Sequence, residues 1–269
     1  MVSTGLARTD GAAAPFFFIQ ISDPQFGFFS SDGFAQETAN LEFAIATVNR
    51  LRPAFLVATG DLVNEAGNAG QVAEYRRIAS KLAPGIPLYN VAGNHDVGNA
   101  PTPETLGAYA GRFGPDHYTF SAPGFVGIVV NSCLLVSPQE APGQARVQEA
   151  WLQAQLEKAR GDGSHVVVFS HHPPFIRDPL ERDEYVNIPR ETRGRLLELF
   201  RKNGVRFVFA GHHHQNAVAR DGDIEVVTTG PIGRPLGEGR SGMRIVTVTD
   251  AGITHRYYEL SELPNRVVL

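Results

Sequence analysis

The 269-residue sequence has a single cysteine, which excludes a disulfide within the chain. Cys133 lies in the apolar run GIVVNSCLLV, where we expect a buried small side chain and not a nucleophile. Positive charge is not in excess either, because the chain has 24 Lys and Arg residues and 28 Asp and Glu residues, which gives a net charge of −4. The chain therefore has no general attraction to phosphate polymers, and we do not expect it to bind nucleic acid.

Long hydrophobic runs are also absent. No segment reaches the roughly 20 apolar residues that a helix needs to span a bilayer. The first residues, MVSTGLARTDGAAAPFFFIQ, lack the basic start, apolar core and cleavage site of a signal peptide. We therefore expect a soluble, cytoplasmic protein without membrane contact. The sequence carries no signal for its oligomeric state.

Short apolar runs and helical patterns alternate along the chain, of which 42% is hydrophobic. The runs that predict strands are FFFIQIS, AFLVATG, PLYNVAG, FVGIVVNS, HVVVFS, RFVFAG, IEVVTT and MRIVTVT. Several are apolar on both faces, as central strands covered by other layers are. Three apolar stripes at helical spacing predict helices: Leu41, Ala44, Ile45 and Val48; Val147, Ala150, Trp151 and Ala154; and Leu196, Leu197 and Phe200. This order of elements predicts a layered α/β sandwich with mixed sheets.

The domain organisation predicted from this pattern is simple. We expect residues 1–14 to form a flexible N-terminal extension and residues 15–269 to form one domain, because no repeat, low-complexity tract or long linker interrupts them. The segment GNAPTPETLG, residues 98–107, is expected to be a loop or lid and not a domain boundary.

Polar side chains collect where five of the predicted strands end. In chain order they are Asp23 and Gln25; Asp61; Asn94, His95 and Asp96; His171 and His172; and His212, His213 and His214. In open α/β sheets, ligands bind beyond the carboxyl ends of the strands. We therefore expect these five ends to converge on one crevice and to supply a multidentate metal site.

The types of these residues favour two cations over one. Carboxylates bridge cations and reduce their repulsion, imidazoles suit transition metals, and amide oxygens are neutral hard donors. The glycines before Asp61, Asn94 and His212 are expected to let the backbone turn sharply at each strand end. Each motif alone has a plainer interpretation, since a single Asp often caps a turn and a His-rich end can be a solvated loop. Their succession at five strand ends favours a dinuclear metal site.

These motifs resemble those of the calcineurin-like metallophosphoesterase superfamily, whose pattern is D-x-H, G-D, G-N-H-[DE], H and G-H-x-H. Here the motifs read DPQ, GD, GNHD, H and GHHH, and the resemblance spans about Phe16 to Leu260. The stretches DPQFG, GNHDVGNAPT, GHHHQNA and HRYYEL look like one branch in particular, described in animals as serine/threonine phosphatases. In that branch Gln is the expected residue at position 25, where most relatives have His.

The resemblance implies a four-layer αββα sandwich of two mixed sheets flanked by helices. It also implies two divalent or mixed-valence metal ions, namely manganese, iron or zinc, and in-line attack on a phosphoric ester by a hydroxide that bridges them. The implied ligands are Asp23, Gln25, Asp61 and His214 for the first metal, and Asp61, Asn94, His171 and His212 for the second. His95 is implied as the general acid or as a charge stabiliser, oriented by Asp96. His172 and His213 are not family ligands.

Three functions remain open at this point. The first is a metal-dependent phosphomonoesterase acting on a phosphorylated substrate, such as phosphoserine or phosphothreonine in proteins. The second is a phosphodiesterase, including a cyclic-nucleotide type, and the third is a scaffold without catalysis. Substrate choice is expected to depend on residues 98–107, 175–185 and 230–242, with Arg177, Arg234 or Arg240 near a phosphate.

Overall fold

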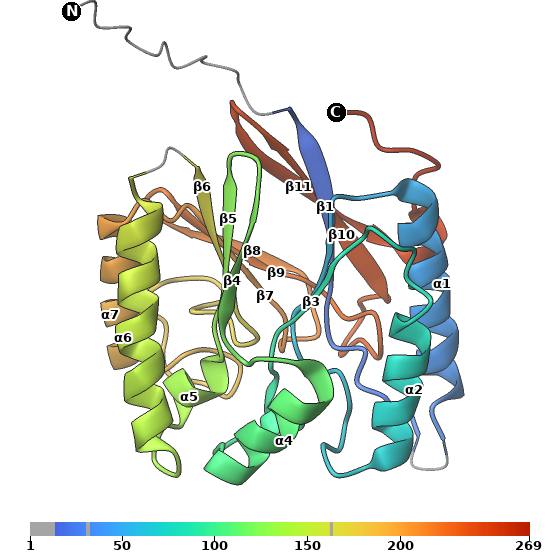
Figure 1. Cartoon of the computed structure of the whole chain (residues 1–269), viewed down its shortest axis with the longest axis horizontal. Coiled ribbons are helices and arrows are strands. Elements are labelled where there is room, and N and C mark those ends of the chain that lie inside the picture. Colours follow the sequence, from blue (N-terminus) through green and yellow to red (C-terminus); the bar gives the residue numbers. More distant parts are fainter. Residues whose placement is uncertain (1–13, 31–32, 162–163) are drawn as a thin grey trace, which may run out of the picture.

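The computed structural model of the protein describes residues 14–30, 33–161 and 164–269. Two β-sheets lie side by side between two pairs of long helices (Figure 1). The predicted N-terminal extension, apart from Ala14, falls outside the described residues. The four-layer arrangement confirms the predicted fold class of two mixed sheets flanked by helices.

The first sheet joins strands from both ends of the described chain. In sheet order they are β11 (Gly252–Glu259), β10 (Gly242–Thr249), β1 (Phe16–Ile21), β2 (Leu56–Ala58) and β3 (Leu88–Asn90). The strands β1, β2 and β3 are parallel, whereas β10 is antiparallel to both β1 and β11. Since β1 to β3 run in the same direction, their carboxyl ends meet at one edge, which carries Asp23, Asp61 and Asn94.

The second sheet is also mixed. In sheet order its strands are β4 (Tyr118–Ala122), β5 (Phe125–Val129), β6 (His165–Phe169), β7 (Phe207–Ala210), β9 (Ile224–Thr228) and β8 (Ala217–Asp221). The inner strands β5, β6, β7 and β9 are parallel, and the outer strands β4 and β8 are antiparallel to their neighbours. The carboxyl ends of β6 and β7 lead directly to His171 and His212.

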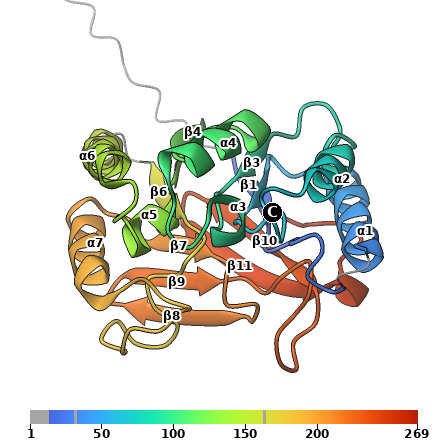
Figure 2. The same cartoon turned by 90° about the horizontal axis from the view of Figure 1, so that it is seen from below.

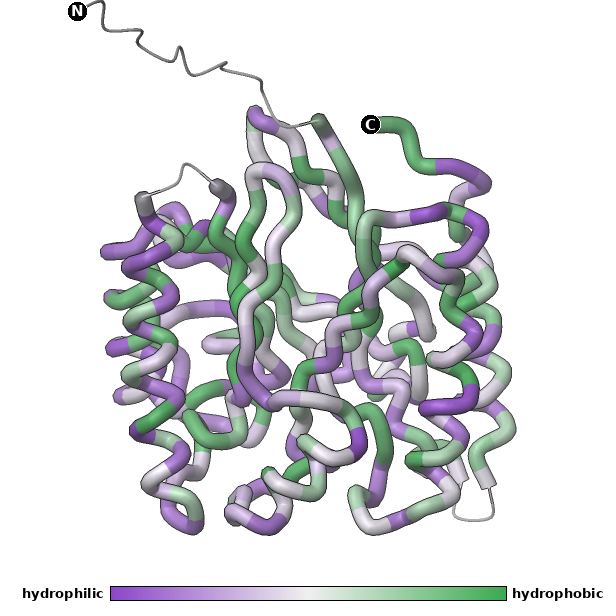
Figure 3. Tube along the Cα trace, in the orientation of Figure 1, coloured by the Kyte–Doolittle hydropathy of each residue, from purple (hydrophilic) through white to green (hydrophobic). Residues whose placement is uncertain are grey.

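Helices cover the outer face of each sheet. The pair α1 (Ala35–Leu51) and α2 (Ala69–Ala79) lies on one side of the molecule, and α6 (Pro142–Ala159) and α7 (Arg190–Lys202) lie on the other (Figure 1). Along these helices hydrophobic and hydrophilic residues alternate (Figure 3). Shorter elements complete the described chain: α3 (Asn94–Val97), α4 (Pro103–Phe113), α5 (Ser132–Val136) and a 3₁₀ helix (Leu260–Glu262). In the view from below, α3 lies between the two helical pairs (Figure 2).

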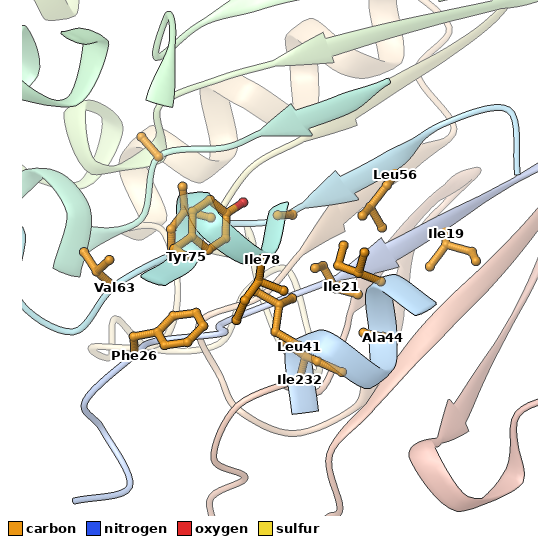
Figure 4. Close-up of a cluster of buried hydrophobic side chains, with 14 of the residues drawn as sticks. Ile19, Ile21, Phe26, Leu41, Ala44, Leu56, Val63, Tyr75, Ile78 and Ile232 are labelled. Atoms are coloured by element: carbon orange, nitrogen blue, oxygen red, sulfur yellow. The ribbon is translucent and has the colours of Figure 1, made fainter. Parts of the chain in front are cut away.

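Alternating side chains of β1 serve two hydrophobic layers. Ile19 and Ile21 point outward to the layer that contains Leu41 of α1 (Figure 4). Phe18 points the other way, where its ring stacks on Phe55 with centroids 4.7 Å apart and belongs to the core between the sheets. Because strands with both faces covered need apolar residues throughout, this arrangement explains their continuous apolar runs. A third layer lies between the second sheet and α6 and α7.

One of the three predicted helical stripes is wrong. The stripes in α1 and α7 are buried as expected, but in α6 Val147 is 62% exposed and the buried face is offset by one residue. That face contains Leu152 and Leu156 and also the polar Gln148. Gln148 can be buried because its amide accepts from the Asn131 N–H at 2.7 Å and donates to the Asn131 carbonyl at 3.0 Å.

Residues 98–107 are not entirely a loop, because α4 begins at Pro103. Thr102 caps this helix: its hydroxyl accepts from the Thr105 N–H at 3.2 Å, and the Thr105 hydroxyl accepts from the Thr102 N–H at 3.0 Å. This reciprocal cap, followed by proline in the first turn, is a helix start that the sequence contains as TPET. None of the helices in the described residues is both long and apolar enough to cross a membrane.

Candidate metal centre

The carboxylate and imidazole groups predicted to bind metal form two adjoining groups that share Asp61. Asp61, His171 and His212 make up one group, and Asp23, Asp61 and His214 make up the other. Within each group the potential ligand atoms lie within 4.8 Å of one another, and all of these residues are buried. A carboxylate common to both groups is the arrangement that two neighbouring cations require.

The backbone of the predicted ligands is unusual. Five of them have positive φ angles: Asp23 (49°), Gln25 (41°), Asp61 (50°), His212 (66°) and His214 (55°). In the part of the chain that the structure describes, the other non-glycine residue with positive φ is Arg52, which ends α1. Positive φ is costly for residues with a Cβ atom, and such residues cluster at functional sites. The ligand residues themselves therefore make the turns that aim their side chains at the cluster.

The glycines before the ligands have two different roles. Gly60 has a φ of 93°, so it does take part in a turn. Gly93 has a φ of −103°, which any residue adopts, and the expectation of a sharp turn there is wrong. A Cβ atom on Gly93 would instead lie 2.1 Å from the backbone nitrogen of Asp61 and 2.2 Å from its Oδ1. Gly93 is required because two ligand loops touch at this point.

Three imidazoles are held by backbone carbonyls in a way that determines their tautomers. The contacts are His171 Nδ1 to the Thr59 carbonyl (2.8 Å), His212 Nε2 to the Tyr185 carbonyl (2.9 Å) and His214 Nδ1 to the Arg234 carbonyl (2.6 Å). Since a carbonyl only accepts, each of these nitrogens carries the hydrogen. The other nitrogen of each ring then keeps a lone pair, as a metal ligand must.

The lone pairs converge around Nε2 of His171. This atom lies 3.1 Å from Nδ1 of His212, 3.2 Å from Oδ1 of Asp61 and 3.0 Å from Oδ1 of Asn94. Four electron-rich atoms at these separations repel one another unless positive charge lies between them. Burial lowers the pKa of His171, but the carboxylates of Asp61 and Asp23 outweigh burial and raise it to about 9. The surroundings of this ring therefore favour positive charge. The donor set thus fits a cation.

The second group is built around Asp23. Its Oδ1 lies 3.5 Å from Nε2 of His214, and both of its oxygens accept from the backbone N–H of His212 at 3.2 Å. Gln25 lies beside this group, because its backbone N–H donates to the Asp61 carbonyl at 2.8 Å. Gln25 is 1% exposed, and its Oε1 has no hydrogen-bond partner among the described residues, while Nε2 donates to Oδ1 of Asn64 at 3.3 Å. A buried amide oxygen without a partner also fits a cation.

His95 lies next to the shared carboxylate. Its backbone N–H donates to Oδ1 of Asp61 at 2.9 Å, and its Nδ1 lies 2.8 Å from the carbonyl of Asn64. Asp96 was expected to orient His95, and the contact that the structure shows for the ring is the Asn64 carbonyl. His95 is half-buried, whereas the neighbouring ligands are buried. Part of its surface is therefore exposed to solvent.

Asp96 holds the loop that follows β2 through hydrogen bonds to its carboxylate. It accepts the backbone N–H groups of Leu62 (2.9 Å), Val63 (3.2 Å) and Gly93 (2.9 Å). Burial and the nearby Asp61 carboxylate raise the pKa of Asp96 to about 8. Asp96 thus acts on the site by joining the loops that carry Asp61 and Asn94.

The remaining histidines and the cysteine lie as follows. His172 is buried, and its Nδ1 lies 2.9 Å from the Ser132 hydroxyl. His213 is half-exposed. Cys133 is buried as expected, and burial raises the pKa of its thiol well above the ordinary value, which disfavours the nucleophilic thiolate form.

The three arginines named from the sequence differ in their relation to the cluster. Arg234 is exposed, with its guanidinium carbon 5.5 Å from the centre of the Phe28 ring, and that ring lies 5.3 Å from the ring of His214. Arg240 instead lies 3.8 Å from the carboxylate of Glu259, and Arg177 is exposed on the loop after β6. Arg234 is therefore the arginine of the three whose surroundings connect it to a predicted ligand.

Sequence reasoning missed three residues that hold the ligands. Asn64 contacts both His95 and Gln25, and Tyr185 and Asn99 both contact the side chain of Asn94. Tyr185 does fall in the segment 175–185 that we expected to frame the site. The sequence signal for Asn64 is limited to its position three residues after Asp61. Asn64 holds the His95 ring with its backbone carbonyl, and a backbone contact cannot be recognised from the residue type.

Comparison with known proteins agrees with this geometry. Residues 18–216 match the family described as Calcineurin-like phosphoesterase. The chain is 36% identical over 269 residues to the rat protein "Serine/threonine-protein phosphatase CPPED1", covering 94% of this chain and 86% of the relative. It is 32% identical over 210 residues to a "Probable cyclic nucleotide phosphodiesterase" of Synechococcus, covering 74% of each.

Among solved structures, a dimetal phosphatase from Danio rerio has the same fold. It superposes with a TM-score of 0.61 at 18% sequence identity, covering 91% of this chain and 99% of that one. The family match extends over most of the chain and includes the strand ends that carry Asp23, Asp61, Asn94, His171 and His214. The chain therefore belongs to the calcineurin-like phosphoesterase family and is a metal-dependent phosphoesterase with a dinuclear metal site.

Proposed function

We propose that the protein is a phosphomonoesterase whose two cations are held by seven residues of the described cluster. The proposed ligands are Asp23, Gln25, Asp61 and His214 for the first cation, and Asp61, Asn94, His171 and His212 for the second. The observation that carries this proposal is the sharing of Asp61 by the two ligand groups. Three imidazoles whose second nitrogens lie inside the cluster support it, as does the amide oxygen of Gln25, which has no hydrogen-bond partner in the part of the chain that the structure describes.

The residues around the cations have separate tasks in this proposal. When bound, a pair of cations supplies positive charge for the phosphoryl oxygens and lowers the pKa of water. Asp61 limits the repulsion between the cations, and its Oδ1 also accepts the backbone N–H of His95. That hydrogen bond ties the position of His95 to the shared ligand.

His95 is proposed to act on the leaving group. The Asn64 carbonyl accepts the hydrogen on Nδ1, so that Nε2 is the atom available to a substrate. With a proton on Nε2, the ring protonates or hydrogen-bonds the leaving oxygen of the ester. Asp96 supports this arrangement through the backbone of the neighbouring loops, and it makes no direct contact with the reacting atoms in the proposal.

The proposed substrate class is a phosphorylated serine or threonine in a protein. The name of the rat relative and the length of the match support this choice over a diester. Manganese, iron or zinc are the proposed metals, because the donor set mixes imidazole with carboxylate and amide oxygen. A cytoplasmic location and a single domain over residues 15–269 complete the proposal, and the latter is supported by the pairing of β1 with β10.

A substrate panel tests the proposal. Protein stripped of metal and reloaded with manganese, iron or zinc is assayed on p-nitrophenyl phosphate, bis-p-nitrophenyl phosphate, cyclic AMP and phosphoserine and phosphothreonine peptides. We expect the highest kcat/KM on monoesters and none without metal. A preference for cyclic AMP or the diester would favour the phosphodiesterase alternative. The similarity to the Synechococcus protein is the observation that supports this alternative. A purified protein that binds no metal and hydrolyses nothing would favour the scaffold.

A further inference from the structure

The loop between β6 and α7 is stabilised by hydrogen bonds between its own residues. The carboxylate of Glu181 accepts three backbone N–H groups, from Ile176 (2.8 Å), Arg177 (2.9 Å) and Asp178 (3.2 Å), and it also accepts from Nδ2 of Asn187 (2.7 Å). The base of the loop is closed by the Ile188 N–H, which donates to the Pro173 carbonyl at 3.1 Å. A loop with this many internal hydrogen bonds holds its outermost residues in defined positions.

The buried guanidinium of Arg193, on α7, joins this loop to the body of the protein. It donates to the carbonyls of Pro174 and Glu181. Its charge also lies 3.8 Å from the Glu181 carboxylate and 3.9 Å from that of Asp183. These contacts anchor the loop at residues 174–183, immediately before Tyr185.

Tyr185 contacts one predicted ligand through its backbone. Its carbonyl accepts the hydrogen on Nε2 of His212 at 2.9 Å, and its ring lies beside the His212 ring with centroids 4.8 Å apart. The carbonyl thus determines which nitrogen of His212 keeps the lone pair. That nitrogen, Nδ1, faces Nε2 of His171 at 3.1 Å.

The Tyr185 side chain contacts a second predicted ligand. Its hydroxyl oxygen accepts from Nδ2 of Asn94 at 2.9 Å, and Oδ1 of Asn99 accepts from the same nitrogen at 3.0 Å. Both hydrogens of the Asn94 amide are then donated to Tyr185 and Asn99, which are not members of the cluster. The amide oxygen is left to face inward, where it lies 3.0 Å from Nε2 of His171.

These contacts are separate from the hydrophobic core. Tyr185 is 63% exposed, so its side chain contributes little apolar burial to folding. The hydroxyl is fixed by polar contacts alone, since it also donates to Oδ1 of Asn99 at 3.4 Å. Removing only the hydroxyl would therefore leave the fold, the ring and the backbone carbonyl in place.

We propose that Tyr185 is a positioning residue that orients Asn94 with its hydroxyl and His212 with its carbonyl, and so sets the affinity of the second cation site. This inference rests on the proposed ligand set, in which both residues bind the same cation. The loop thereby acts on one cation and leaves the first, held by Asp23, Gln25, Asp61 and His214, unaffected.

Calorimetric titration of metal-stripped protein with Mn²⁺ tests this proposal. The variants are Tyr185→Phe, Asn94→Ala and the double variant, with Tyr258→Phe on β11 as a matched control. We expect wild type and the control to bind two cations. In Tyr185→Phe one binding step should weaken about 10-fold or more, as removal of an outer hydrogen-bond partner of a metal ligand does. Adding Tyr185→Phe to Asn94→Ala should weaken that step no further, because the hydroxyl acts through Asn94.

Turnover supplies a second readout. Activity of Tyr185→Phe should return toward that of wild type when Mn²⁺ is raised well above the concentration that saturates wild type. The proposal is overturned if both Mn²⁺ affinities of Tyr185→Phe equal those of wild type, or if both steps weaken equally. If wild type itself binds fewer than two cations, the proposed ligand set fails as well, so the two failures are distinguishable.

Discussion

Nε2 of His171 and Nδ1 of His212 face each other at 3.1 Å, and each ring donates its other nitrogen's hydrogen to a backbone carbonyl. Two neutral acceptors do not attract at this separation, so the pair requires a cation or a proton between its members. The carboxylates of Asp61 and Asp23 raise the pKa of His171, because they stabilise positive charge at this position. The positions of the histidines are thus explained by the charge that the site is built to hold.

Asp61→Asn is expected to abolish most hydrolysis. One carboxylate belongs to both ligand groups, and an amide of the same shape neither carries charge nor bridges two cations well. We expect a loss of at least ~100-fold in kcat/KM together with loss of bound metal. Metal content by elemental analysis, with turnover on p-nitrophenyl phosphate, measures both. Two retained metals and a near-normal rate would refute the bridging role.

His95→Asn should reduce turnover by about 10²–10⁴-fold, the usual contribution of general acid-base catalysis, with both metals retained. Both metals should be retained because His95 is half-exposed and its hydrogen bond to Asp61 comes from its backbone N–H, which the variant keeps. The loss should be smaller on p-nitrophenyl phosphate, whose leaving group needs little protonation, than on a phosphoserine peptide. Equal losses on the two substrates would instead indicate charge stabilisation by the ring.

Gln25→His is expected to tighten the first cation site and to shift the activating metal toward zinc. The buried Oε1 of Gln25 is a neutral oxygen donor, whereas imidazole nitrogen is preferred by softer transition metals. Competitive titration of stripped wild type and variant with manganese and zinc measures the shift. If Gln25 only hydrogen-bonds Asn64, as its Nε2 does at 3.3 Å, affinity and metal preference will stay unchanged.

Gly93→Ala should disturb the metal site, because the added Cβ would lie 2.1 Å from the backbone nitrogen of Asp61. We expect loss of bound metal and of activity. Gly107→Ala is the matched control, since Gly107 is an exposed residue of α4 whose Cβ would meet nothing within 4 Å. That variant should keep its activity and gain about 0.5–1 kcal/mol in the free energy of unfolding, measured by denaturant titration. Normal metal content in Gly93→Ala would contradict the close approach of the two loops.

The central strands could be recognised in the sequence because both of their faces are covered. The strands that were not predicted, β4, β8 and β11, all lie at sheet edges. Their residues are partly exposed, so they lack a continuous apolar run. The face of α6 was assigned wrongly for a related reason. Its buried Gln148 looks polar until the hydrogen bonds to the Asn131 backbone are known.

The sequence by itself determined the chemistry of the site, because carboxylate, amide and imidazole donors follow successive strand ends and parallel strands bring such ends together. Only the tertiary structure decided how those donors are aimed. The carbonyls of Thr59, Tyr185 and Arg234 select the tautomers of three histidines, and the carbonyl of Asn64 holds His95. Every residue has a backbone carbonyl, so the residue type does not predict which carbonyl will contact which histidine ring. These contacts depend on how segments far apart in the chain pack together.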